Sequence, residues 1–384
     1  MDLSPKQQAV TLIQNAKRIL LLAHQNPDSD GAGSLLGLNL VLRKLHKEVE
    51  MSLQDKIPEN LLFLPNSQSV SSEINGSREF VINLNCTHGE VEKLGYKLEN
   101  NALKIVITPK TGHFEKDDLK IESGTLKFDL IIVLDTPDFE RLGNIYEKNA
   151  DTFYETSIIN IDHHPTNNYF GKVNLVDLTA TSTSEILIAI IEALETEGKI
   201  LDEDIATCLL AGITGDTGSF QNTNTTPKSL TCAAQLLAAG ARQQEIVKNL
   251  FKTKPLSTLR LWGRILDKIE VDPRHRIVYS LTTKADLESA QAKEESFSGA
   301  IDELLRSAKS SDLALLLTER EKGIAGSLRS IDPNVDCIEI ARAFGGGGHK
   351  GAAAFLITDK SLDQVKEEVL EKIREYQKRR LSLD

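Results

Sequence analysis

The chain has 384 residues, of which 40% are hydrophobic, so it is long enough for two or three domains with substantial cores. Aromatic residues make up only 5%, and aliphatic side chains must therefore do most of the packing. The formal net charge of −11 argues against non-specific binding to long nucleic-acid duplexes, because that activity needs an extended basic surface. A local basic pocket for a short substrate is still compatible with this charge.

Cysteine usage and hydropathy indicate the compartment. The four cysteines are scattered without a CxxC pair, which is typical of reduced thiols in a cytosolic protein. The polar, amphipathic N-terminus does not resemble a signal peptide, and no apolar run approaches the roughly 18 residues that would span a membrane. We therefore expect a cytoplasmic protein with no membrane partner.

The first part of the chain alternates apolar strands with helices. Helices are predicted over residues 5–17, 35–47, 184–195 and 205–213, and strands over residues 18–24, 128–135 and 157–162. Ser182 and Glu185 match a capping box at the start of one helix. This alternation predicts an α/β domain with a mainly parallel sheet flanked by helices.

Residues 71–127 interrupt the alternation with three strand-like runs and a charged segment between them. This pattern predicts a small inserted β-rich subdomain. We weigh two interpretations of it. One is a peripheral embellishment, and the other is a lid or a contact that alters oligomer or substrate choice.

The last third of the chain has a different organisation. Residues 251–272 are expected to be a helical linker after a first domain over 1–250. Residues 273–384 are predicted to form a smaller α+β domain. Its expected elements are three strands, a helix near 338–344, the glycine-rich segment GGGGHKGAAAF and a charged helix over 363–380.

Acidic and histidine residues cluster at the carboxyl ends of predicted strands or in the loops that follow elements. The clusters are His24, Asp28 and Asp30; Asp135; Asp162, His163 and His164; and Asp216. Because open α/β sheets place their sites at the carboxyl ends of their strands, these side chains can converge on one edge. Crowded carboxylates repel one another, and divalent cations resolve that conflict. Carboxylates with imidazoles favour Mn²⁺, with Mg²⁺, Co²⁺ or Fe²⁺ as alternatives, and the absence of cysteine argues against a thiolate zinc site.

Each of these residues also has a structural explanation when it is taken alone. Asp28 and Asp30 suit turn or N-cap positions, and His24 suits a core histidine. The run Asp162-His163-His164 after a buried strand is much harder to explain structurally. The clusters together, in this order, favour a metal centre.

Four motifs, AHQNPDSDGAGS, VLDTPD, NIDHHPTN and GITGDTGSF, resemble those of the DHH phosphoesterase superfamily. The C-terminal GSLRS and FGGGGHKGAAAF resemble its glycine-rich DHH-associated domain. The pairing is similar to the oligoribonuclease (nanoRNase) and phosphoadenosine-phosphate phosphatase subgroup, whose relatives include cyclic dinucleotide phosphodiesterases. The resemblance covers nearly the whole chain except the inserted segment.

The resemblance implies a role for each candidate residue. One metal would be bound by His24, Asp28 and Asp135, and the other by Asp30, Asp135, His163 and Asp216, with Asp135 bridging the two. His164 would face the substrate phosphate as a hydrogen-bond donor or general acid, and Asp162 would support the histidines from behind.

In the second domain, glycines let the backbone approach a ligand closely, and their N–H groups can hold a phosphate. The candidate substrate-binding residues are Arg329, Ser330, Gly346, Gly347, Gly348, His349 and Lys350.

The sequence therefore predicts a phosphoesterase with two Mn²⁺ ions. Its expected substrates are short RNA or DNA oligonucleotides, dinucleotides, or nucleotide 3′-phosphates such as phosphoadenosine phosphate. Three alternatives stay open, namely a cyclic dinucleotide phosphodiesterase, a single-strand exonuclease and a non-catalytic nucleotide sensor. The acidic charge and few aromatics disfavour the exonuclease, and the complete set of candidate ligands disfavours the sensor. A homodimer is expected from the resemblance only.

Overall fold

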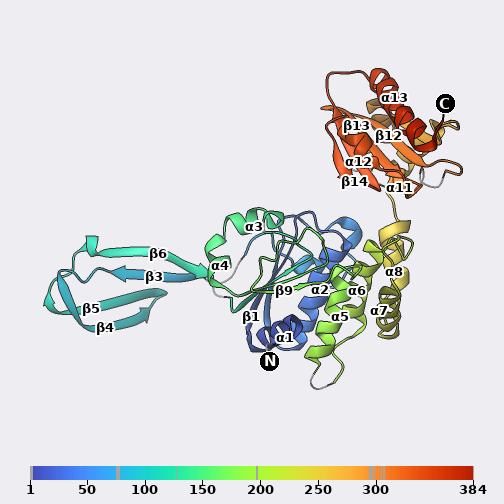
Figure 1. The fold of residues 1–384 in the computed structure, drawn as a ribbon. Coiled ribbons are helices and arrows are strands. Elements are labelled where there is room, and N and C mark those ends of the chain that lie inside the picture. The colour runs from blue at the N-terminus through green and yellow to red at the C-terminus, as the bar shows by residue number, and fades with distance from the viewer. Residues whose placement is uncertain are drawn as a thin grey trace. The chain divides into compact units, whose positions relative to one another are not determined.

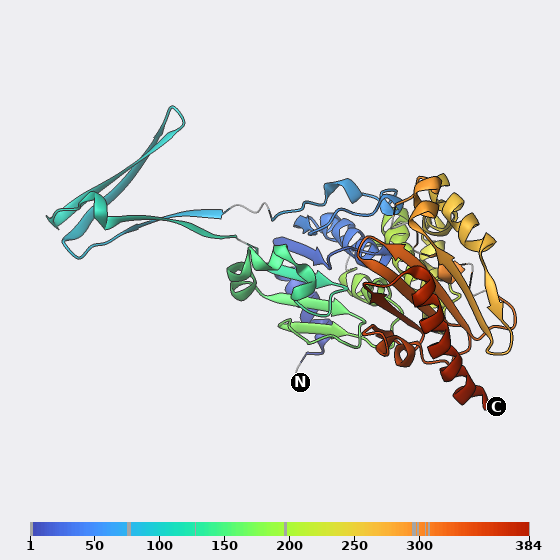
Figure 2. The same cartoon turned by 90° about the horizontal axis from the view of Figure 1, so that it is seen from above.

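A computed structural model describes residues 3–74, 78–126, 128–195, 198–293, 297, 299–303, 305 and 308–383. The chain divides into two compact units, Met1–Thr253 and Lys254–Asp384, and each is described by itself (Figure 1, Figure 2). The four cysteines all lie in the described residues and form no disulfide. In this described part of the chain, every helix is too short or too polar to span a bilayer.

Unit 1 is built on a five-stranded parallel sheet with the order β2-β1-β7-β8-β9. The strands are β1 (Arg18–Ala23), β2 (Glu48–Ser52), β7 (Leu130–Leu134), β8 (Ile158–Asp162) and β9 (Val173–Val176). The three predicted strands correspond to β1, β7 and β8, whereas β2 and β9 were not predicted. The strand order reverses between β1 and β7, because β2 lies on one side of β1 and the later strands lie on the other. Open α/β sheets bind ligands at such a switch point.

Both faces of this sheet are covered, as the unbroken apolar runs of its strands require. Ile19 and Leu21 of β1 belong to one hydrophobic core, and Leu20 and Leu22 to the core on the opposite face, because successive side chains alternate along a strand. The first face carries α1 (Pro5–Asn15), α2 (Ser29–Lys44), α5 (Thr183–Leu194) and α6 (Glu203–Asp216), and the second carries α3 (Asn144–Glu147) and α4 (Ala150–Glu155) (Figure 1). Helices α7 (Pro227–Ala238) and α8 (Gln243–Val247), followed by the π-helical turn Lys248–Lys252, complete the unit.

Two helix boundaries differ from the predicted ones in ways that matter for the site. Helix α2 begins at Ser29 rather than at residue 35, because the Asp28 carboxylate caps it by accepting from the N–H groups of Asp30 and Gly31. Helix α6 continues past residue 213 and ends at Asp216. Acidic residues that were expected in loops therefore lie at helix ends.

The capping box predicted at α5 is half present. Ser182 is the N-cap and accepts from the Glu185 N–H. The Glu185 carboxylate accepts instead from the backbone N–H and the hydroxyl of Thr181.

The inserted segment contains two antiparallel ribbons, β3–β6 and β4–β5. The strands are β3 (Arg78–Leu84), β4 (Gly89–Glu99), β5 (Ala102–Gly112) and β6 (Leu119–Leu126). The segment expected to be merely charged forms β4. Its charges conceal a strand pattern, in which Leu94, Tyr96 and Leu98 alternate with other residues at a period of two.

Unit 2 has a six-stranded sheet with the order β10-β11-β12-β13-β15-β14. Its strands are β10 (Glu270–Asp272), β11 (Ile277–Thr282), β12 (Leu313–Arg320), β13 (Gly323–Ser330), β14 (Gly347–His349) and β15 (Ala352–Ile357). Its helices are α9 (Leu256–Asp267), α10 (Lys284–Ala290), α11 (Ala300–Glu303), α12 (Cys337–Arg342) and α13 (Leu362–Leu381). The sheet is antiparallel apart from the β11–β12 pair.

Two features of unit 2 differ from the expected organisation. Leu261 and Ile265 of α9 share a hydrophobic core with Val278 of β11, so the helix expected in the linker packs within unit 2. The glycine-rich segment forms the edge strand β14 rather than only a loop. The predicted fold class, an α/β domain with a mainly parallel sheet followed by a smaller α+β domain, is confirmed.

Candidate metal centre

The predicted acidic and histidine residues meet at the carboxyl edge of the unit 1 sheet, at the switch point between β1 and β7. His24 directly follows β1, Asp135 directly follows β7, and Asp162 ends β8 with His163 and His164 after it. Asp28 and Asp30 lie at the start of α2, and Asp216 is the last residue of α6. The side chains therefore come from the carboxyl ends of β1, β7 and β8, the start of α2 and the end of α6.

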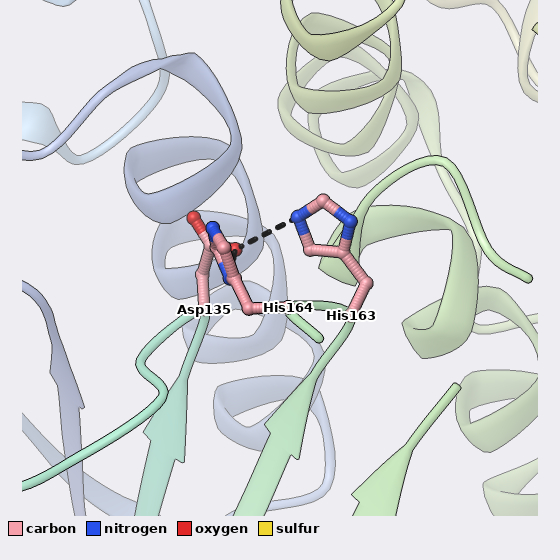
Figure 3. A group of neighbouring side chains, drawn as sticks. All are labelled: Asp135, His163 and His164. Carbon is pink, nitrogen blue, oxygen red and sulfur yellow. Dashed lines mark ion pairs between the residues drawn. The ribbon is translucent and has the colours of Figure 1, made fainter. Parts of the chain in front are cut away.

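Asp135 lies at the centre of the cluster. Its Oδ2 is 3.4 Å from Nε2 of His24. Its Oδ1 is 3.4 Å from Nε2 of His163, and Figure 3 shows this ion pair. The Asp135 backbone has a φ of 52°, a left-handed conformation that costs free energy in a non-glycine residue and often marks a functional site. Its N–H donates to the Ile161 carbonyl at 2.9 Å, which fixes the turn against β8.

The side chains form overlapping groups whose donor atoms lie within 4.8 Å of one another. These groups are His24, Asp28 and Asp135; Asp30, His163 and Asp216; and Asp135, His163 and His164. Asp135 and His163 connect the groups, because each belongs to two of them. All six residues that the resemblance implies as ligands are thus brought together in two adjacent sets.

Burial keeps two of the carboxyl groups neutral in the protein alone. It raises the pKa of Asp30 to about 8, and the nearby Asp135 charge adds to the effect. Burial raises the pKa of Asp216 to about 10, with Asp30 and Asp135 as further causes. Such carboxyl groups lose their protons when a cation offsets the repulsion between them.

The two histidines beside Asp135, His24 and His163, have raised pKa values. Burial by itself lowers the pKa of His24, but the nearby carboxylates of Asp135 and Asp28, 3.4 Å and 3.9 Å from its Nε2, outweigh it and raise the pKa to about 10. His163 behaves likewise, and contact with Asp135 raises its pKa to about 9. The pKa of Asp135 is held well below its usual range, because the two histidines outweigh its burial. The mixture of carboxylate oxygens and imidazole nitrogens suits divalent cations.

The buried Asp162 carboxylate contacts both His163 and His164. Its buried Oδ1 accepts from the His163 backbone N–H at 2.8 Å and lies 2.7 Å from His164 Nδ1. Its Oδ2 accepts from the Asn167 amide at 2.6 Å. The hydrogen bond with Asp162 raises the pKa of His164. The His164 side chain is 40% exposed against 17% for His163, so His164 is the histidine that is open to a substrate.

Two contacts at this site were missed in the sequence. Asp30 is fully buried and accepts from the backbone N–H groups of Thr183 at 2.6 Å and Ser184 at 2.9 Å, in the first turn of α5. The Thr183 hydroxyl also donates to Asp135 Oδ1 at 3.1 Å. The capping signal at Ser182 could have revealed this arrangement, since the first N–H groups of a helix attract an anion.

Glycines allow the helices that carry these carboxylates to approach closely. A Cβ at Gly31 would lie 2.8 Å from His24 Nε2, and one at Gly212 would lie 2.5 Å from Asp30 Oδ1. Gly31 and Gly212 are therefore required by the close packing around His24 and Asp30.

The candidate substrate-binding residues of unit 2 gather where β13, β14 and β15 meet. Arg329 pairs with Ala352, which in turn pairs with His349, so Arg329 and His349 share one face of the sheet with a small side chain between them. The Ser330 N–H donates to the Gly351 carbonyl at 2.9 Å, next to Lys350. Gly346 precedes β14, and Gly347 and Gly348 lie within it.

A cavity of about 650 Å³ lies beside this segment. Small residues, including Ser327, Gly346 and Ala354, line it, and Arg320 and Lys322 also contribute. Among the candidate substrate-binding residues, only Gly346 lines this cavity. Arg320 and Lys322 were not identified in the sequence, where lone basic residues at a strand end carry no distinctive signal.

Comparison with known proteins identifies the family. Residues 18–213 match the model of the DHH family N-terminal domain, and residues 277–379 match the DHHA1 domain. A protein of Thermus thermophilus named bifunctional oligoribonuclease and PAP phosphatase NrnA is 30% identical over 360 residues, which cover 93% of this chain and 89% of that protein. A protein of the same name from Bacillus subtilis is 28% identical, over 60% of this chain and 70% of its own length.

Two further comparisons extend this result. The cyclic-di-AMP phosphodiesterase PdeA of Listeria monocytogenes is 25% identical over 96% of this chain and 49% of its own length. The crystal structure of an exopolyphosphatase-related protein from Bacteroides fragilis superposes with a TM-score of 0.75 at 21% identity, covering 97% of both chains, and supports the fold. The chain therefore belongs to the DHH family, and it is an enzyme that hydrolyses phosphate esters.

Proposed function

We propose that this protein is a manganese-dependent phosphoesterase with two metal ions, which hydrolyses short oligonucleotides, dinucleotides or nucleotide 3′-phosphates such as phosphoadenosine phosphate. One observation carries the proposal. Six acidic and histidine donors converge at the switch point in two adjacent sets, and Asp135 of the first set lies 3.4 Å from His163 of the second.

One ion would be held by His24, Asp28 and Asp135, and the other by Asp30, Asp135, His163 and Asp216. When bound, two such ions polarise a phosphate ester and lower the pKa of a water molecule. Asp135 would contact both ions, because its two oxygens point at histidines from different sets. The first turn of α5 would hold Asp30 in place through the Thr183 and Ser184 N–H groups.

His164 would act on the substrate directly. Asp162 holds its Nδ1, so the ring is oriented and favours the protonated form. A protonated imidazole can donate a hydrogen bond to a phosphoryl oxygen, where negative charge grows in the transition state. It can also protonate the departing alkoxide as a general acid. Asp162 is a positioning residue in this scheme, because it is buried and does not reach the substrate.

We assign catalysis to the first domain and substrate recognition to the second. Arg329, Ser330, Gly346, Gly347, Gly348, His349 and Lys350 would bind the phosphate or base of a small substrate. The relatives named as oligoribonucleases and PAP phosphatases support this substrate class. The acidic net charge of −11 disfavours long strands.

A hydrolysis assay with several substrates tests the proposal. The protein would be incubated with Mn²⁺ and a diadenylate, a short RNA, phosphoadenosine phosphate, cyclic di-AMP or pyrophosphate. We expect release of mononucleotides or phosphate from the diadenylate, the short RNA or phosphoadenosine phosphate. We also expect loss of release in an Asp162→Ala/His163→Ala variant. Turnover of cyclic di-AMP alone would favour the alternative of a cyclic dinucleotide phosphodiesterase. No turnover of any nucleotide by a metal-loaded protein would contradict the proposal.

A further inference from the structure

The inserted segment carries a dense group of exposed apolar side chains. Large hydrophobic side chains of the β4–β5 ribbon lie open to solvent, with Tyr96 at 81%, Leu98 at 72% and Leu94 at 66% exposure. Phe80 of β3 and Ile121 of β6 are exposed by 70% and 60%. Large exposed apolar patches on a protein mark an interaction surface.

These side chains share faces because of the strand register. In β4–β5, Leu94 lies opposite Ile107, Tyr96 opposite Ile105 and Leu98 opposite Leu103. Directly opposed residues of an antiparallel pair point to the same side, so three apolar pairs form one continuous face, here called the apolar ribbon face.

The other side of the same ribbon is mostly polar, apart from Val106, which lies opposite Gly95. Lys93 lies opposite Thr108, and Lys97 opposite Lys104. The β3–β6 ribbon shows the same division, with Ile82 opposite Ile121 and Leu84 opposite Leu119. An amphipathic ribbon with a water-exposed apolar face lacks the layer that such a face ordinarily packs against.

Within the described residues, no third strand pairs with either ribbon. An isolated two-stranded ribbon is marginally stable in water and gains stability from packing on its hydrophobic face. We propose that the apolar ribbon face of β4–β5 is a self-association surface, and that two copies of this chain pack these faces against each other.

The area of the exposed surface supports a second copy as the occupant. The large exposed side chains of the apolar ribbon face, Leu94, Tyr96, Leu98, Leu103 and Ile105, offer roughly 550 Å² per copy, taking about 150–200 Å² for each full side chain. Specific protein interfaces bury about 600–1,000 Å² per partner, so two such faces approach the lower end of that range. Two such faces stacked about 10 Å apart would form a small sandwich with its own core.

The charge of the segment also favours self-association. Residues 78–126 contain seven Lys or Arg and eight Asp or Glu, a net charge of −1, although the whole chain carries −11. Two copies therefore meet here with little repulsion. The apolar ribbon face has no basic side chain to hold nucleic acid, and its turn carries Glu99, Asn100 and Asn101, which disfavour insertion into a bilayer.

Sedimentation of the full-length protein tests the proposal with a matched pair of variants. Tyr96→Lys/Leu98→Lys places two positive charges on the apolar ribbon face. The control Val106→Lys/Thr108→Lys places two on the opposite face of the same ribbon. We expect wild type and the control to sediment at twice 42.4 kDa, and the first variant at 42.4 kDa with a dimer Kd at least 100-fold weaker.

A crosslinking experiment keeps the test decisive if the lysine variant unfolds the ribbon. In a Cys86→Ser background, Tyr96→Cys should form a crosslinked dimer with a short bifunctional reagent, and Val106→Cys should not. A monomeric wild type at 100 μM would overturn the proposal. So would equal dimerisation of both lysine variants, or equal crosslinking of both cysteine variants.

Discussion

The metal centre and the apolar ribbon face depart from the usual division between a protein's interior and its surface in opposite ways. At the metal centre Asp30 and Asp135 are 0% and 1% exposed, although carboxylates belong in water. On the ribbon Tyr96 is 81% exposed, although its ring belongs in a core. The buried carboxylates suit the divalent cations proposed above, and the exposed apolar side chains suit the proposed second copy of the chain.

Asp272 in unit 2 is a carboxylate whose charge is balanced by partners from the same chain. Its Oδ2 lies 2.9 Å from both Arg374 Nε and His275 Nδ1. Burial opposes its ionisation, but these partners prevail and lower its pKa to about 2. The pKa of Asp30 and of Asp216 is instead raised, because both carboxyl groups are buried and the nearby charges are mostly acidic. This contrast distinguishes a carboxylate that is paired within the chain from those that we propose to bind a cation.

The largest expected effect follows from Asp135→Asn. Asp135 meets both donor sets, so its loss should weaken both ions and lower kcat/KM for a diadenylate by at least about 1000-fold. Steady-state kinetics with Mn²⁺ measure the change. Asp138→Asn, outside the donor sets, is the matched control and should retain activity. If Asp135→Asn lowered kcat/KM by less than tenfold, Asp135 would be an ordinary buried carboxylate and not a metal ligand.

Metal binding should stabilise the folded protein. A ligand present at about 100 times its Kd adds about 2.7 kcal/mol per site, so saturating Mn²⁺ should raise the Tm by several degrees. Differential scanning fluorimetry measures this shift, and a chelator should reverse it. Asp135→Asn should lose most of the shift. An identical Tm with and without Mn²⁺ would speak against a built cation site.

Thr183→Val should have a smaller effect on the same site. Valine keeps the volume but removes the hydroxyl that donates to Asp135, so Mn²⁺ affinity should fall about tenfold. Isothermal titration calorimetry gives the Kd. Thr231→Val, at an exposed position on α7, is the control and should bind Mn²⁺ normally. Equal Mn²⁺ affinities in the two variants would show that the Thr183 hydroxyl does not help to position Asp135.

The smallest effect concerns the pH dependence of unit 2. Because the pKa of Asp272 is lower in the folded state than its ordinary value of 3.8, its charge stabilises the fold above about pH 4. That contribution, about 1 kcal/mol after solvent screening, disappears as the pH falls towards 2. Urea unfolding at pH 7 should show Asp272→Asn less stable than wild type by this amount, and the difference should vanish near pH 2. A difference that persists there would contradict the ion-pair explanation.

Local patterns predicted much of unit 1 and the candidate site. The strand ends at His24, Asp135 and Asp162 were predictable, because long apolar runs specify buried strands and parallel topology brings their ends together. Capping was visible at Ser182, but the burial of Asp30 against the N–H groups of α5 was not, since that contact joins residues 153 positions apart.

Other features depended on tertiary contacts that no local pattern encodes. Asp216 was expected after a helix, whereas it is the last residue of α6. Strand β4 was concealed by its charges, and its alternation became evident only opposite β5. Helix α9 had the composition of a linker, whereas Leu261 and Ile265 bury it in unit 2.

The most direct test of the central claim is an anomalous difference map from Mn²⁺-soaked crystals at the manganese absorption edge. We predict two peaks about 3.5–4 Å apart, one on each side of Asp135. One would lie against His24 and Asp28, and the other against Asp30, His163 and Asp216. A single peak, or peaks away from Asp135, would contradict the account of a two-metal centre at the switch point.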